Sequence, residues 1–220
     1  MSPDSASGFT GKAYTEYTTA VQEQMELFNG REHIDYLYKF DVGSPYFLAG
    51  NFSKGDVTYL NKTYKDVSLT YDVVKDEVAI LHFNILKRLI PDKLKLDAFT
   101  INGHHFIKLS PGITNYKSLP EGYYDLLYND KISLLAKRTK SIRDIIPEIR
   151  VYSKDIFYIS KNNTFYEVNA NKSFLKHFTD KKKQITQFMR QNDISFTGNK
   201  EQAMIKIITH YNSLVKQDED

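Results

Sequence analysis

Cysteine and tryptophan are both absent from the 220 residues of this chain, and the net charge is only +3. Without thiols the chain has no disulfide, thiolate metal site or thiol nucleophile, and it lacks the usual compositional clue to its compartment. The weak net charge gives no sign of the dense basic stripe of nucleic-acid-binding proteins, so we expect no nucleic-acid partner. No apolar run approaches the roughly 20 residues that span a bilayer, so the chain is not predicted to be membrane-spanning.

Common catalytic motifs are missing as well. The sequence has no Gly-x-Ser-x-Gly nucleophile elbow and no glycine-rich phosphate-binding loop. Three carboxylates, Asp72, Asp76 and Glu77, cluster in one stretch, but they do not follow the spacing of a calcium loop, so we interpret them as turn residues. These absences favour a protein without a cofactor or a metal ion, and they disfavour an enzyme.

Aromatic residues are abundant instead, with 16 Tyr and 14 Phe. Tyr suits half-buried strand positions, where the ring is inside and the hydroxyl reaches water. Between Gly43 and Asp125, short segments of alternating polarity are separated by Gly, Asn, Asp and Pro, which predicts consecutive antiparallel hairpins. Asn102-Gly103 is the strongest hairpin signal, because both residues tolerate positive φ.

Two further local patterns make testable structural predictions. Ile34, Tyr36 and Tyr38 alternate with polar neighbours and predict a strand, and Tyr46-Phe47-Leu48 opens the next one. Lys54-Gly55-Asp56 predicts a turn, because glycine between charged residues commonly ends a strand.

The last fifty residues follow a helical period. Met204, Ile207, Ile208, Tyr211, Leu214 and Val215 form one apolar stripe that must be buried against the sheet. Asn199 is predicted to cap this last helix, together with Gln202, and Asp180 is predicted to cap the helix before it.

We therefore predict a mainly β protein with C-terminal helices, of the α+β class. A leader and a short helix are expected in residues 1–28, with the helix itself at about Thr15 to Phe28. Residues 29–170 are expected to form about ten strands in an antiparallel meander or open half-barrel. Residues 171–220 are expected to form two or three helices that pack on this sheet, within the same domain as the sheet.

The cations Lys137, Arg138, Lys140 and Arg143 lie close together in the sequence. One interpretation is a surface patch for an anionic partner, such as a glycan or a lipid headgroup. The other is the solvated edge of a strand, where Lys and Arg block edge-to-edge aggregation.

Histidines supply the remaining candidate chemistry. His33 and Asp35 have the i, i+2 spacing that places two side chains on one face of a strand, whereas His104 and His105 point to opposite faces. A hydrolase is a hypothesis only if at least two of these four side chains converge within hydrogen-bonding reach. No third ligand lies near His33 and Asp35, so we predict no metal site.

Six segments share a pattern with other proteins: Leu27–Tyr36 (LFNGREHIDY), Gly43–Phe47 (GSPYF), Val57–Val67 (VTYLNKTYKDV), Leu69–Asp72 (LTYD), Gly122–Tyr128 (GYYDLLY) and Leu134–Arg138 (LLAKR). Over about Phe28 to Leu214 the chain resembles a family of uncharacterised exported proteins from Bacteroidota. That family has no assigned activity, so the resemblance implies only an extracytoplasmic setting, in the periplasm or at the cell surface.

Three hypotheses of function follow. The leading one is a non-enzymatic cell-envelope protein that binds another envelope protein or a glycan. The second is a carrier of a lipid or other apolar ligand in a half-closed barrel, which requires an apolar cavity. The third is a hydrolase with a site that motifs do not reveal.

Overall fold

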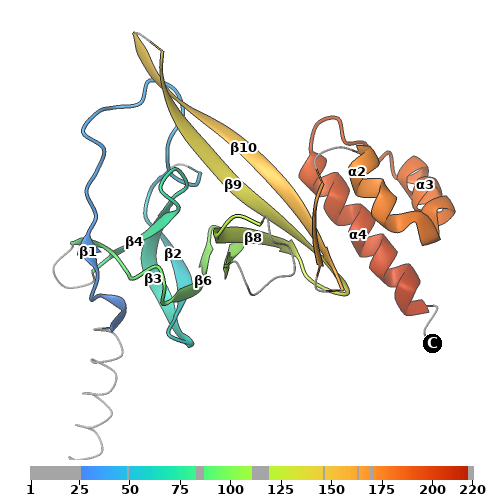
Figure 1. Cartoon of the computed structure of the whole chain (residues 1–220), viewed down its shortest axis with the longest axis horizontal. Coiled ribbons are helices and arrows are strands. Elements are labelled where there is room, and N and C mark those ends of the chain that lie inside the picture. Colours follow the sequence, from blue (N-terminus) through green and yellow to red (C-terminus); the bar gives the residue numbers. More distant parts are fainter. Residues whose placement is uncertain are drawn as a thin grey trace, which may run out of the picture. The chain divides into compact units, whose positions relative to one another are not determined.

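The computed structural model describes residues 26–48, 50–82, 87–110, 119–145, 147–162, 164–168 and 171–217. Its described residues form mainly antiparallel sheet, with eleven strands that remain open, followed by C-terminal helices; strand accounts for 46% of the described residues and helix for 23%. The predicted fold class is therefore confirmed (Figure 1). The predicted helix at about Thr15 to Phe28 lies outside the described residues, apart from its last turn.

The chain divides into two compact units. The first contains the residues up to Lys39 together with Tyr46–Asn102, and the second contains Phe40–Pro45 together with Gly103–Asp220. None of the described helices is both long and apolar enough to cross a membrane.

The first unit is a six-stranded antiparallel arrangement in the order β1-β5-β4-β3-β2-β6. Its strands are β1 (Arg31–Glu32), β2 (Ser53–Tyr59), β3 (Lys62–Asp72), β4 (Glu77–Leu81), β5 (Arg88–Ile90) and β6 (Leu96–Ile101). Alternation places Leu69 and Tyr71 of β3 in the core, where the Tyr71 ring meets Phe99 edge-on with centroids 5.2 Å apart.

Two local predictions in this unit are wrong. Gly55 lies inside β2 and not in a turn. A Cβ at this position would come within 1.9 Å of the carbonyl oxygen of Thr100, so β2 needs glycine here to let the backbone of Thr100 approach closely. Residues 33–38 form an extended coil and not a strand, and Tyr46 makes only an isolated bridge, with Asp72.

The second unit contains a five-stranded antiparallel arrangement in the order β7-β8-β9-β10-β11. Its strands are β7 (His104–Leu109), β8 (Gly122–Tyr128), β9 (Ile132–Ile145), β10 (Glu148–Lys161) and β11 (Thr164–Glu167). The residues Asn102 and Gly103, which precede β7, both have positive φ, as predicted. The strands β9 and β10 form a long hairpin of 14 residues each (Figure 1).

The helices of the second unit are α2 (Asn171–Leu175), the 3₁₀ helix η1 (Lys176–Lys181), α3 (Lys182–Gln191) and α4 (Lys200–Gln217). The predicted stripe of α4 is confirmed, since Ile207 and Ile208 are fully buried in one cluster with Leu134 of β9 and Ile159 of β10. The hydrophobic stripe therefore attaches α4 to the sheet.

The two predicted helix caps have different outcomes. The Asn199 side-chain oxygen accepts a hydrogen bond from the backbone N–H of Gln202 at 3.0 Å, which confirms the first cap. Asp180 does not cap α3; its carboxylate accepts a hydrogen bond from the Tyr211 hydroxyl at 2.9 Å, so the side chain is used in a tertiary contact.

Candidate functional site

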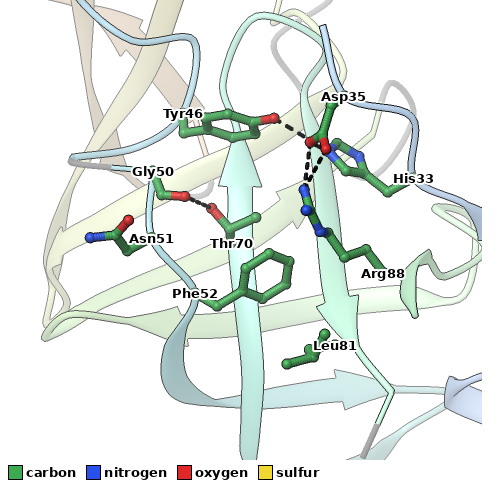
Figure 2. A pocket seen from close by; sticks show the side chains of 9 residues that line it. All are labelled: His33, Asp35, Tyr46, Gly50, Asn51, Phe52, Thr70, Leu81 and Arg88. Atoms are coloured by element: carbon green, nitrogen blue, oxygen red, sulfur yellow. Dashed lines mark hydrogen bonds and ion pairs between the residues drawn. The ribbon is translucent and has the colours of Figure 1, made fainter. Parts of the chain in front are cut away.

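A polar pocket with a volume of about 290 Å³ lies in the first unit. It is built by the coil that follows β1, by the segment that precedes β2, and by β3, β4 and β5 (Figure 2). Its lining residues are His33, Asp35, Tyr46, Gly50, Asn51, Phe52, Thr70, Leu81 and Arg88. Most of these residues are polar, and they come from segments that are far apart in the sequence.

His33 is the most buried titratable group of the pocket. Its backbone N–H donates to the carbonyl oxygen of Arg88 at 2.9 Å, and its side chain is only 2% exposed. Its Nε2 lies 3.3 Å from the Tyr46 hydroxyl and 3.5 Å from Asp35 Oδ1. Burial lowers the pKa of His33 from 6.5, and this effect exceeds the opposing one of Asp35. The imidazole is therefore neutral at pH 7.

Asp35 and Arg88 form an ion pair at the mouth of the pocket. Arg88 Nη1 lies 2.6 Å from one carboxylate oxygen of Asp35 and 2.7 Å from the other. Both side chains are accessible, with 57% of Asp35 and 45% of Arg88 exposed. Figure 2 shows the pair beside His33 and the Tyr46 hydroxyl. The pocket thus presents a carboxylate and a guanidinium whose charges cancel.

The remaining lining combines hydrogen-bonding groups with apolar surface. Thr70 is buried, and its hydroxyl donates to the carbonyl oxygen of Gly50 at 3.4 Å. Asn51 is exposed and Phe52 is half-buried. Figure 2 shows the Phe52 ring between Thr70 and Leu81. The pocket therefore offers an aromatic face as well as donors and acceptors.

Residues 33–39 and 46–48 form the coil of the first unit, and a buried carboxylate holds this coil on the sheet of that unit. Asp72 is 1% exposed, and its Oδ1 accepts hydrogen bonds from the backbone N–H groups of Val74 and Lys75, both at 3.0 Å. This geometry confirms the turn role predicted for Asp72. Its Oδ2 accepts the Tyr36 hydroxyl at 2.9 Å, and burial together with this hydrogen bond raises the pKa of Tyr36. The Phe47 N–H donates to the carbonyl of Tyr71 at 2.7 Å and holds the other end of the coil.

The four predicted patch cations do not share one exposed surface. Lys137 is buried, and its ammonium donates to the Tyr123 carbonyl at 3.1 Å. Since neighbouring residues of a strand point to opposite faces, Arg138 lies on the other side of β9. Lys140 donates to the Ser44 carbonyl at 2.8 Å. The exposed residue of the four is Arg143, which lies over the ring of Tyr152.

Arg138 is the centre of a buried ionic network in the second unit. It donates to Asp125 through Nε at 3.0 Å, to Asp155 at 2.7 Å and to Glu201 of α4 at 2.8 Å. Burial alone would lower the pKa of Arg138, but its hydrogen bonds to Glu201 and Asp125 raise it, so the guanidinium remains charged. This cation therefore serves an internal network, and an external anion would have to compete with three carboxylates.

The four residues of the hydrolase hypothesis separate into two places. His33 and Asp35 are brought together in the pocket, at 3.5 Å. His104 lies in the second unit, where its Nδ1 is 2.7 Å from Asp125, and His105 is exposed. Within the described part of the chain, no three His, Cys, Asp or Glu side chains form a group that could hold a metal ion.

Sequence reasoning identified His33 and Asp35 but missed Arg88 and Thr70 as members of the site. Arg88 lies 53 residues from Asp35 in the sequence, and no motif links the two. Compared with known proteins, the chain matches no protein-family model, no curated protein and no solved structure.

Proposed function

We propose that this protein is a non-enzymatic binding protein of the cell envelope and that the pocket of the first unit is its ligand site. The observation that carries the proposal is the convergence of His33, Tyr46 and the Asp35–Arg88 pair on one accessible hollow. Concave sites with a few converging polar groups are typical of ligand binding. The envelope setting rests on the resemblance to exported proteins.

The chemistry of the pocket favours binding over hydrolysis. Among the described residues, its lining includes no serine, cysteine or lysine. Thr70 carries the one aliphatic hydroxyl of the lining, and this group donates to the Gly50 carbonyl and has no base beside it in the described contacts. Covalent catalysis by serine, threonine or cysteine needs that side chain paired with a base, and the described lining does not provide such a pair.

The carrier hypothesis receives no support from the described hollows. The pocket of the first unit is lined mostly by polar residues. A second, shallow hollow of about 720 Å³ along α3 is lined by charged and amide side chains and one threonine, among them Lys182, Lys183 and Arg190. A lipid-sized apolar ligand would require a different lining.

Ligand-detected NMR with a panel of small polar compounds tests the proposal. The panel contains neutral methyl glycosides, uronic acids, amino acids and inorganic phosphate. We expect at least one class to bind the wild type and to lose binding in Arg88→Leu. A matched variant, Arg143→Leu, removes an exposed arginine of the second unit and should bind as the wild type does. If no compound binds, or if the binding is insensitive to Arg88→Leu, the pocket is not the ligand site.

A further inference from the structure

We infer that the ligand of this pocket is a neutral sugar residue, held through two neighbouring hydroxyl groups by Asp35 and Arg88. This inference rests on the proposed function, because it names the class of ligand for the same pocket. Three properties of the pocket carry it: its charge balance, the arrangement of its donors and acceptors, and its size with its aromatic face.

The charge balance of the pocket disfavours an ionic ligand. Arg88 is the one permanent cation among the described lining residues, and it is already paired with both oxygens of Asp35. His33 is neutral, because burial lowers its pKa. A phosphate or carboxylate bound to Arg88 would be repelled by the adjacent carboxylate of Asp35, and an ammonium ligand bound to Asp35 would be repelled by the adjacent guanidinium of Arg88. A neutral ligand leaves the ion pair intact.

The arrangement of donors and acceptors suits a pair of hydroxyl groups. A guanidinium has five N–H donors, and the contacts with Asp35 use only the Nη1 nitrogen of Arg88. A carboxylate has about four acceptor positions, so Asp35 keeps capacity for a further donor. One sugar hydroxyl can donate to Asp35 while its neighbour accepts from Arg88. Both hydrogen bonds are charge-assisted, and both side chains are accessible.

The size and the apolar part of the pocket fit one sugar ring. Its volume of about 290 Å³ has room for one hexose ring. The C–H face of a sugar is apolar and packs against aromatic rings, and Phe52 supplies such a ring. Asn51 also lines the pocket, and its side-chain amide carries both a donor and an acceptor.

An experiment that neutralises Asp35 tests the inference. Asp35→Asn keeps the size of the side chain but leaves Arg88 as an unpaired cation. We expect neutral methyl glycosides to bind this variant at least about tenfold more weakly than the wild type, because a charge-assisted hydrogen bond is lost. Inorganic phosphate and glucuronate, which should bind the wild type weakly or not at all, should bind Asp35→Asn more tightly. Isothermal titration calorimetry measures the dissociation constant of each protein variant for each of these compounds.

The matched control is Glu32→Gln, which removes a nearby exposed carboxylate whose partner is Lys87 and which does not line the pocket. This variant should have the wild-type affinity both for neutral methyl glycosides and for phosphate and glucuronate. If phosphate or glucuronate binds the wild type more tightly than every neutral glycoside and requires Arg88, the sugar inference is overturned while the pocket remains the ligand site. If no probe depends on Arg88, the proposed function itself fails. Circular dichroism of each variant verifies that its fold is retained.

Discussion

The replacement Arg138→Met should destabilise the second unit strongly, because it leaves a buried charge without its main partner. Asp125 is 1% exposed, and it accepts two hydrogen bonds from Arg138, through Nε and Nη2. After the replacement, the described partner of its carboxylate is His104 alone, at 2.7 Å. Asp155 and Glu201 are 39% and 27% exposed, so water can solvate them once Arg138 is gone.

The expected magnitude is set by Asp125. Removing one partner of a buried ion pair costs about 3–5 kcal/mol. The free energy of unfolding should fall by about this amount, which is a change of a hundredfold or more in the unfolding equilibrium constant. Urea titration followed by far-UV circular dichroism measures it, with the midpoint and the slope fitted separately.

Two further variants separate this explanation from a general effect of losing an arginine. Arg150→Met removes an arginine of the same hairpin that pairs with Glu148 near the surface, and it should leave the stability unchanged. The double variant Arg138→Met/Asp125→Leu removes both charges and should recover most of the loss. The reasoning is refuted if Arg138→Met unfolds at the same urea concentration as the wild type, or if the double variant is no more stable than the single one.

Three smaller predictions concern local features. Asn199→Ala should lower the free energy of unfolding by about 1 kcal/mol, because it removes the cap of α4, and thermal unfolding should show a lower midpoint. In urea titration, Gly55→Ala should destabilise the first unit more than Gly198→Ala destabilises the second. A Cβ at position 55 would come within 1.9 Å of the carbonyl oxygen of Thr100. A Cβ at position 198 would meet nothing within 4 Å, so the strain there comes only from the positive φ. The His33 side chain takes up a proton near pH 6.5 in the unfolded chain but only at lower pH in the folded chain, so the free energy of unfolding should fall as the pH drops below 6.5. Urea titrations at pH 7.5 and pH 5.5 should show a smaller fall for His33→Gln than for the wild type. An equal fall in the two proteins would contradict this prediction.

The sequence predicted the scaffold well, because hydrophobic period and turn chemistry are local signals. Asn102-Gly103 stands between β6 and β7 with both residues at positive φ, and the stripe of α4 is buried as its spacing indicates. The coil at residues 33–38 shows where the same signal fails. Ile34 is 69% exposed and Leu37 is 97% exposed, so the alternation of Ile34, Tyr36 and Tyr38 does not reflect a buried face. Tyr36 is held by Asp72 and not by strand pairing.

The cations at 137–143 illustrate a related limit of local sequence patterns. A run of Lys and Arg in the sequence carries no information about distant carboxylates. Asp125, Asp155 and Glu201 lie 13, 17 and 63 residues from Arg138, and only the pairing of β8, β9 and β10 and the packing of α4 bring them together. The patch hypothesis counted charges, whereas the fold determines which of them reach solvent.

The pocket of the first unit illustrates why a scaffold is easier to predict than a site. Its position depends on a coil that strand pairing does not specify, and that coil is fixed by long-range polar contacts: Tyr36 with Asp72, the His33 N–H with Arg88, and the Phe47 N–H with Tyr71. Each of these contacts joins residues at least 24 positions apart, and none has a signature in the hydrophobic pattern. Hydrophobic periodicity can therefore place β3 and β4, but the polar contacts determine which side chains face one another above them.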